Sequence, residues 1–319
     1  MFSLSEPPLF TRLRDARRVL IAGAGGGFDV YAGIPLALAL RAAGKDVHLA
    51  NLSFTNLTAL DIDSWVQPGV AAVTPSTDGV KGGYFPERVL ATWLAAEKLP
   101  STVYAFPRVG VRPLRLAYES LLSHLGIDAI VLVDGGTDIL LRGDEVGLGT
   151  PEEDMTSLAA VAGIEGVQRL VVCIGFGIDT YHGVCHSLVL ENLAALTRTG
   201  TYLGAFSVPP ESEEAKAYLR AVDHAAAATP RRPSIVNGQI AASLRGEFGD
   251  SQFTERTAGS ELFVNPLMSL YFTLDLPGLA ASIGYLPQLA ESIHMAEVAM
   301  VIREHREHVE RRTWRAFPH

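Results

Sequence analysis

A dense run of acidic residues follows one apolar segment of the chain and is the feature best suited to chemistry. From Asp134 to Asp154 the sequence holds seven carboxylates and one basic residue, Arg142. The apolar run 129–133 predicts a buried strand, and Asp134 and Asp138 come just after it. Removing a carboxylate from water is costly unless it is paired or bound to a cation. The pattern therefore indicates bound positive charge at this point.

We predict that Asp134 and Asp138 are ligands of a divalent cation. Carboxylate oxygens on a glycine-bearing loop suit a hard cation such as Mg²⁺, which keeps several waters and bridges to substrate phosphate. Two alternatives stay open. Neighbouring turns could donate hydrogen bonds to both carboxylates, or Arg108 or Arg142 could neutralise them.

The rest of the acidic run has structural interpretations. The stretch 150–153 matches a capping box, with Thr150 at the N-cap, proline at the first helical position and Glu153 reaching back. Asp144 and Glu145 lie in a glycine-flanked loop, so we expect both to be solvated.

A glycine-rich turn after the first expected strand is the second candidate site. Gly25, Gly26 and Gly27 would let backbone N–H groups approach an anion at the start of the following helix, where the helix dipole favours negative charge. Phosphate is the expected anion. Asp29 ends the turn as a candidate ligand-binding residue, although it could equally cap the helix.

The turn departs from known nucleotide fingerprints. Phe28 occupies the place of the third glycine of G-x-G-x-x-G, and the next strand ends at Asn51 rather than at an acid. We keep Asn51 as a candidate cofactor-binding residue, but NAD is not favoured. The Gly-Lys-Ser/Thr of a Walker loop is also missing from the turn.

A third cluster follows another strand. Asp179 comes just past the strand end and is a candidate catalytic residue, with His182 as a proton carrier. His182, Cys185 and His186 have separations typical of zinc ligands, but no second Cys/His pair accompanies them. Cys185 could be an activated thiolate at a helix start, or simply a small buried side chain.

The elements that must position these residues alternate along most of the chain. Short β-branched apolar runs, which predict buried strands, are followed by longer segments with helical spacing. We expect strands at 19–22, 47–52, 102–106, 129–133, 170–174, 202–206 and 234–236, and helices at 35–43, 86–98, 114–125, 152–162, 187–197 and 211–228.

This alternation predicts an α/β fold, a doubly wound and mostly parallel Rossmann-like sheet covered by helices on both faces. Every turn from a strand to a helix then opens at the carboxyl edge of the sheet. The three candidate clusters are therefore expected along one crevice.

We expect a Rossmann-like domain over 1–240 and a C-terminal helical or irregular extension, 241–319, packed on that domain. The polar, glycine-bearing stretch 246–261 is typical of a lid-like loop. An apolar segment over 262–276 follows it, and a terminal helix is expected over 287–312.

Composition excludes several classes of protein. A formal charge of −9 argues against general affinity for nucleic acid or for an anionic membrane. The longest apolar stretches fall far short of the roughly 18 residues that cross a bilayer. With two cysteines and no signal-peptide pattern, we expect a cytoplasmic protein with a small-molecule ligand. The sequence does not specify an oligomeric state.

Three motifs together resemble a family that has no assigned activity. Gly25-Gly26-Gly27-Phe28-Asp29-Val30, the stretch 133–138 and the stretch 149–154 are similar to those of the prokaryotic family known as domain of unknown function 1152. The resemblance covers most of the chain. It implies neither a reaction nor a cofactor, so every expectation about function rests on the residues.

The leading hypothesis is an enzyme that acts on a phosphate-bearing small molecule or nucleotide with a divalent cation, as a phosphoryl or pyrophosphoryl transferase or hydrolase. Two alternatives remain. A binding or sensing protein would use the same crevice without chemistry, and a Cys-dependent hydrolase would use Cys185 with His182.

Overall fold

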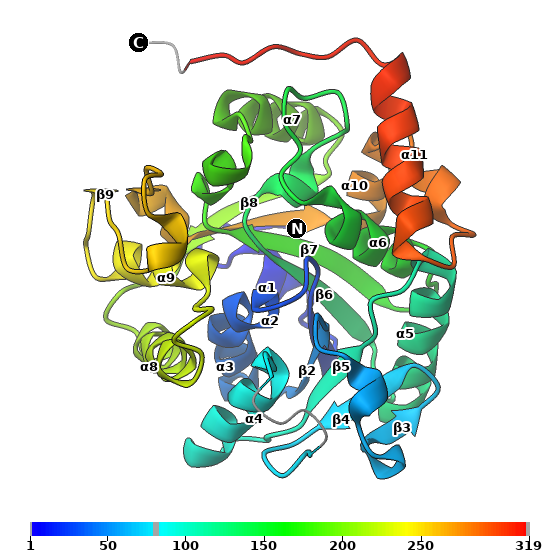
Figure 1. Cartoon of the computed structure of the whole chain (residues 1–319), viewed down its shortest axis with the longest axis vertical. Helices are drawn as coiled ribbons and strands as arrows, with labels where there is room; N and C mark the ends of the chain where they lie inside the picture. The colour runs from blue at the N-terminus through cyan, green and yellow to red at the C-terminus, as the bar shows by residue number, and fades with distance from the viewer. Residues whose placement is uncertain (1, 79–82, 317–319) are drawn as a thin grey trace.

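A central sheet runs through the molecule (Figure 1), and in the part of the chain that the structure describes it has nine strands. The computed structural model describes residues 2–78 and 83–316. The strands lie in the order β3-β4-β5-β2-β1-β6-β7-β11-β8. Their bounds are β1 Arg18–Gly23, β2 Asp46–Leu52, β3 Trp65–Gln67, β4 Val70–Val73, β5 Val103–Phe106, β6 Ala129–Gly135, β7 Gln168–Ile174, β8 Tyr202–Ser207 and β11 Leu270–Asp275.

Six strands follow the Rossmann order. β5, β2, β1, β6 and β7 are joined by parallel pairings, and β8 runs in the same direction. Numbered among themselves along the chain, these six have the arrangement 3-2-1-4-5-6. β11 lies antiparallel between β7 and β8, and β4 lies antiparallel against β5. The expected α/β class and mostly parallel sheet are confirmed.

Helices cover both faces of the sheet, and alternate strand residues face each layer. In β1, Leu20 and Ala22 pack on one layer, whereas Val19 and Ile21 pack on the other. The first layer contains α5 Val111–Leu125, α6 Pro151–Ala162, α7 His186–Arg198, α10 Leu276–Ser282 and α11 Met295–His308. The second contains α1 Pro8–Arg12, α2 Asp29–Ala32, α3 Ile34–Ala42, α4 Pro86–Ala96, α8 Glu213–Ala228 and α9 Ile235–Leu244.

The expected strand at 234–236 is wrong, because this stretch begins α9. The Ser234 hydroxyl accepts a hydrogen bond from the Asn237 N–H and caps the helix. The structure also places residue 240, where the sequence predicts a domain boundary, inside this helix.

The expected terminal helix is shorter than 287–312. The carbonyls of Ser292 and Ile293 accept hydrogen bonds from the N–H groups of Arg112 and Gly110 at the start of α5 rather than from a helix of their own. α11 therefore begins at Met295, and it ends at His308. β3, β4 and β11 were not expected, and β11 brings the extension into the main sheet.

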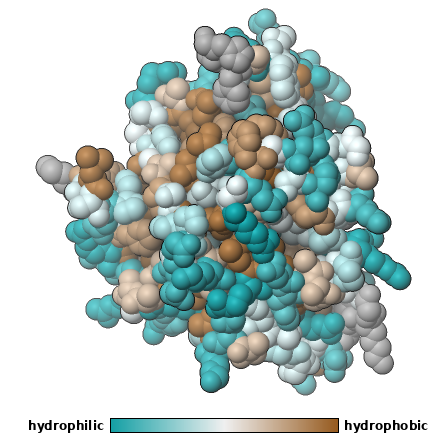
Figure 2. All heavy atoms as spheres, turned by 90° about the vertical axis from the view of Figure 1, so that its left-hand side faces the viewer, coloured by the Kyte–Doolittle hydropathy of each residue, from teal (hydrophilic) through white to brown (hydrophobic). Residues whose placement is uncertain are grey.

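The lid-like stretch 246–261 lies on one flank of the molecule, beside α9. It includes β9 Gly249–Asp250, which pairs with β10 Phe263–Val264. Phe248 and Phe263 stack edge to face, with their ring centroids 5.2 Å apart. The face that carries this flank mixes hydrophilic and hydrophobic side chains (Figure 2). Among the described residues, no helix is long and apolar enough to cross a membrane.

Candidate acidic cation site

The candidate site lies where the order of strands reverses. The chain goes from β1 to β2 on one side and later returns to β6 on the other, so the carboxyl ends of β1 and β6 lie at the switch point where open α/β sheets bind their ligands. Asp29 follows β1, Asp134 lies at the end of β6, and Asp179 follows β7. The first turn of α6 adds Asp154. Four acidic side chains thus reach one sheet edge from four segments.

Three of these carboxylates form the closest group. One oxygen from each of Asp29, Asp134 and Asp154 lies within 4.8 Å of the others. This is the single group of at least three potential metal ligands found in the described part of the chain. Asp134 is 3% exposed and Asp154 is 1% exposed. Asp154 was not among the residues expected from the sequence.

The hydrogen bonds of the trio leave oxygen atoms for a cation. Asp29 Oδ2 accepts from the Gly25 N–H at 2.6 Å, and Asp134 Oδ2 accepts from the Ile139 N–H at 3.4 Å. Asp154 Oδ1 is buried and has no hydrogen-bond partner. A buried carboxylate oxygen without a partner is costly, and a divalent cation shared by the three side chains would remove that cost.

Asp138 and Asp179 border the trio and are tied to the backbone. Asp138 Oδ2 accepts from the Thr150 N–H at 2.8 Å, and Asp179 Oδ2 accepts from the Thr137 N–H at 2.7 Å. The structure thus brings Asp134 and Asp138 to one site, as expected, but the close group pairs Asp134 with Asp29 and Asp154. That Asp138 is itself a ligand stays a prediction.

Burial and mutual repulsion raise the pKa values of the carboxyl groups in the cluster. Burial raises the pKa of Asp29 to about 8, against the opposing hydrogen bond from Gly25. Burial, followed by the charge of Asp138, raises the pKa values of Asp134, Asp154 and Asp179 well above their usual range. Without a cation, Asp29 keeps its proton at neutral pH, and the raised pKa values of the other three also favour their protonated forms.

Arg108 is held at the edge of the cluster by Glu153. An Arg108 Nη2–Glu153 Oε1 ion pair of 2.5 Å joins the two side chains, and the guanidinium lies over the ring of Phe54. The capping box expected for Glu153 is wrong, because the Thr150 side chain makes no capping hydrogen bond and Glu153 turns toward Arg108. The Arg108 side chain is 54% exposed, so it can also reach a ligand.

The glycine turn lies against the cluster. A Cβ atom at Gly25 would come within 2.7 Å of Asp29 Oδ2 and 2.8 Å of Asp154 Oδ1. Gly26 and Gly27 have φ values of +84° and +59°, which L-residues rarely adopt. The turn needs glycine both for close approach and for its backbone conformation.

Asn51 lies beneath this turn, fully buried. Its amide nitrogen donates to the Gly27 carbonyl at 2.9 Å and to Glu87 Oε1 at 2.7 Å. Burial raises the pKa of Glu87 to about 7. In this geometry Asn51 supports the glycine turn from below. Its contact with a cofactor stays a prediction.

The expected solvation of Asp144 and Glu145 is wrong. Glu145 is fully buried, and Asp144 is half-buried and paired with Arg142 and Arg312. Arg142 therefore does not neutralise the trio. The partner that buries Glu145 comes from the far end of the chain, which the local sequence does not reveal.

The third cluster divides into two parts. Asp179 joins the acidic site, and the charge of the nearby His182 opposes the rise in the pKa of Asp138. His186 bonds to the Thr180 hydroxyl at 2.8 Å. Cys185 is 1% exposed, and its thiol donates to the Arg315 carbonyl at 3.4 Å. This geometry favours a buried structural thiol over a nucleophile.

A small cavity of about 150 Å³ lies beside the glycine turn. Its walls include Phe28 and Tyr31 from the region of α2, Asn237 from α9, and Phe253 from the lid-like stretch. The Asn237 side chain also donates to the Phe28 carbonyl, one residue before Asp29. The cavity and the acidic site are thus linked through the consecutive residues Phe28 and Asp29.

The comparison with known families agrees with the motifs. The sheet and its two helix layers make the chain an α/β protein. The profile of the family described as "Protein of unknown function (DUF1152)" matches residues 20–310, so the chain belongs to this family. No curated protein matches the chain.

One solved structure with a partial likeness is a glycosyltransferase, SsfS6 from Streptomyces sp. SF2575. It is 16% identical, and the aligned part covers 57% of this chain and 44% of that chain. The TM-score is 0.23, so nothing about function is taken from it.

Proposed function

We propose that this protein is a divalent-cation-dependent enzyme that acts on a phosphate-bearing small molecule. The observation that carries the proposal is the group formed by Asp29, Asp134 and Asp154, in which Asp154 Oδ1 lacks a hydrogen-bond partner. Three hard oxygen donors on one side of an ion suit Mg²⁺ or Mn²⁺, whose remaining positions hold water and substrate oxygens.

The surroundings of the trio favour an anionic substrate once a cation is bound. Arg108 is exposed at the edge and could contact a phosphate oxygen. Within the glycine turn, Gly25 and Asp29 are partly exposed, so these are the two positions that a substrate could contact. The cavity beside Phe28 has the size of a single aromatic ring, which makes a nucleotide the first substrate class to test.

The simplest reaction of this class is hydrolysis of a phosphate ester or anhydride. A water oxygen bonds to phosphorus, the bond from phosphorus to the leaving oxygen breaks, and that oxygen takes up a proton. A bound cation would neutralise charge on the phosphoryl oxygens. Asp179, whose pKa burial raises well above its usual range, can hold the proton for the leaving oxygen. The attacking water loses a proton as its oxygen bonds to phosphorus, and His182 can accept that proton and pass it to solvent.

The test is cation binding and turnover in the purified protein. Mn²⁺ binding is measured by electron paramagnetic resonance, and release of inorganic phosphate or pyrophosphate is measured with Mg²⁺ and a panel of nucleoside mono-, di- and triphosphates. Asp134→Asn and Asp154→Asn are each expected to weaken Mn²⁺ binding at least about a hundredfold and to abolish turnover. Asp61→Asn, at an exposed position without a side-chain cap, is the matched control.

The outcomes separate the competing functions. Wild-type Mn²⁺ affinity in both cluster variants would refute the cation site. Tight binding of cation and nucleotide without formation of product would instead indicate a sensing protein that binds its ligand at the same site.

A further inference from the structure

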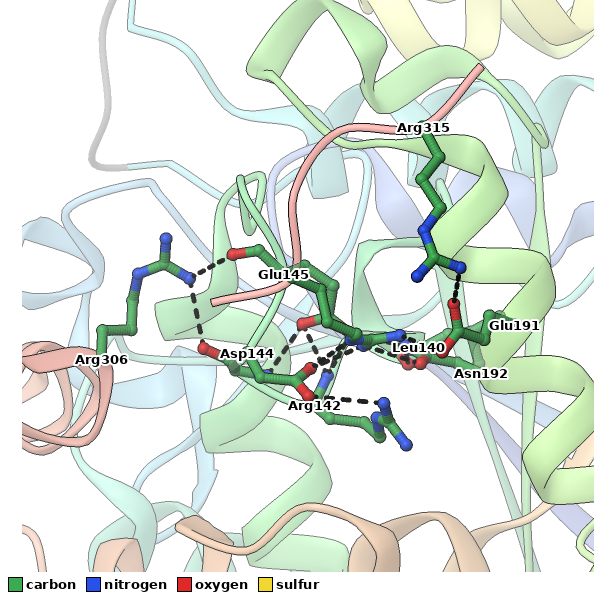
Figure 3. A network of polar contacts seen from close by, with 10 residues as sticks. Leu140, Arg142, Asp144, Glu145, Glu191, Asn192, Arg306 and Arg315 are labelled. Atoms are coloured by element: carbon green, nitrogen blue, oxygen red, sulfur yellow. Dashed lines mark hydrogen bonds and ion pairs between the residues drawn. The ribbon is translucent and has the colours of Figure 1, made fainter. Parts of the chain in front are cut away.

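Residues 309–316 form an extended segment that follows α11 and lies along the loop 141–150 and α7 (Figures 1 and 3). Arg312 makes its central contacts. The Arg312 N–H donates to the Asp144 carbonyl at 2.7 Å, and its guanidinium donates to Asp144 Oδ1 at 2.6 and 3.0 Å. The same guanidinium donates to Glu145 Oε1 at 2.6 Å. The segment is thus fastened to the loop through both backbone and side chain.

Glu145 is the buried acidic partner of Arg312 in these contacts. Its carboxylate is fully buried, and it accepts hydrogen bonds from the N–H groups of Arg142 and Gly143 and from the Asn192 amide of α7. Arg312 supplies the ion pair that balances its charge. Removing one partner of a buried ion pair is strongly destabilising, because the other charge remains buried.

A second arginine holds the same loop from α11. Arg306 points toward the loop and donates to the carbonyls of Gly143 at 3.3 Å and Glu145 at 3.0 Å (Figure 3). It also donates to the Val146 carbonyl at 3.2 Å. A Cβ atom at Gly143 would lie 2.7 Å from the Tyr285 ring, so the loop packs closely on this side. The loop is therefore held both by α11 and by the segment that follows it.

The loop connects two parts of the acidic site. It begins just after the 3₁₀ helix Asp138–Leu140 and ends at Thr150, whose N–H fixes the Asp138 carboxylate. α6 starts at the next residue and carries Asp154 in its first turn. A shift of the loop would therefore move Asp138 and Asp154 relative to Asp134, which lies at the end of β6.

We propose that the segment 309–316 positions the acidic site, and that Arg312 is the positioning residue through which it acts. The Arg312 side chain contacts Asp144, Glu145, Glu191 and Asn192 rather than the trio. It sets the place of the loop and hence the spacing of Asp154 and Asp134. This inference rests on the proposed function where it concerns cation affinity, but the ordering of the loop can be tested without a cation.

The experiment compares the full-length wild type with Arg312→Ala, Arg312→Lys and Arg311→Ala. Arg311 precedes Arg312 and is exposed, and its guanidinium donates to the backbone carbonyl of Arg306 rather than to the loop, so it is the matched control. Hydrogen exchange over 141–150 is measured with EDTA, and Mn²⁺ affinity is measured separately by electron paramagnetic resonance. Lysine keeps the charge but loses the planar fork, so Arg312→Lys is expected to fall between wild type and Arg312→Ala.

The expected result is faster exchange over 141–150 and at least about tenfold weaker Mn²⁺ binding in Arg312→Ala, with Arg311→Ala like wild type. Unchanged exchange in the folded Arg312 variants would overturn the proposal. Faster exchange with unchanged Mn²⁺ affinity would overturn the link to the site. If wild type binds no Mn²⁺, the proposed function fails, and the exchange experiment alone then decides whether Arg312 orders the loop.

Discussion

Asp154 distinguishes the acidic site from an ordinary group of capped or hydrogen-bonded carboxylates. Asp138 and Asp179 each accept a short hydrogen bond from a backbone N–H. Asp154 Oδ1 is equally buried and accepts none. An unpaired carboxyl oxygen in the interior is stable only when the group is protonated or lies beside positive charge. Asp154 Oδ1 is therefore the oxygen that a bound cation would stabilise most.

Glu87 allows a test of buried charge away from the trio. It is fully buried, its Oε2 has no hydrogen-bond partner, and its pKa is about 7 against an ordinary value of 4.5. Because the folded state binds this proton more tightly than the unfolded state, the contribution of Glu87 to stability falls as pH rises from about 4.5 to 7. Above a pH of about 7 this contribution of Glu87 to the free energy of unfolding is fully lost.

We therefore expect Glu87→Gln to gain stability relative to wild type between pH 5 and pH 8, by roughly 2–3 kcal/mol at 1.36 kcal/mol per pKa unit. Glutamine keeps the oxygen that accepts from Asn51 but cannot ionise. Urea unfolding at the two pH values measures the change. The control is Glu119→Gln, which replaces an exposed glutamate of α5. A pH-independent difference between Glu87→Gln and wild type would contradict this explanation.

Several site residues could be predicted from local sequence because each follows a strand. Asp29, Asp134 and Asp179 come at or just after the ends of β1, β6 and β7, where a parallel sheet collects its functional groups. Asp154 could not be found in this way, because its place depends on how α6 packs. Glu145 was misjudged since its arginine partner lies 167 residues further along the chain.

The glycine turn is the element on which the trio depends most directly. At Gly25 the backbone approaches two of the three carboxylates, and any side chain there would occupy the space between Asp29 and Asp154. The requirement is spatial, since Gly25 is not among the glycines with positive φ. A methyl group should therefore disturb the site more than the fold.

Gly25→Ala is expected to weaken Mn²⁺ binding at least about tenfold, while the protein remains folded by circular dichroism. Gly284→Ala is the matched control, because a Cβ atom there meets nothing within 4 Å and its φ is not positive. Isothermal titration with Mn²⁺ compares the two variants. Wild-type affinity in Gly25→Ala would show that the turn does not form part of the cation site.

At the level of elements, regular alternation was predictable and antiparallel insertion was not. Six of the seven expected strands lie in the sheet and run in one direction, because buried β-branched runs followed by helices admit few other arrangements. β11 lies between β7 and β8, and its pairing partner on β7 lies about a hundred residues earlier in the chain. Local periodicity carries no information about such a pairing.

The molecule as a whole combines an acidic net charge with an acidic cluster inside its sheet edge. The formal charge is −9, and five aspartates gather at this sheet edge, four of them buried and Asp29 partly exposed. Each has a folded-state pKa above its unfolded value, so each contributes stability that is present at low pH and is lost as pH rises through the folded pKa. For Asp29 this range runs from about 4 to about 8.

The whole-molecule prediction is that a divalent cation stabilises the protein more at pH 8 than at pH 5. At pH 5 the cluster keeps its protons, which must be released before the cation can bind. At pH 8 the cation instead relieves repulsion among ionised groups. Thermal unfolding with EDTA and with excess Mg²⁺ measures the gain in melting temperature at both pH values. A gain that is equal at the two values, or larger at pH 5, would mean that the cation does not bind among these carboxylates.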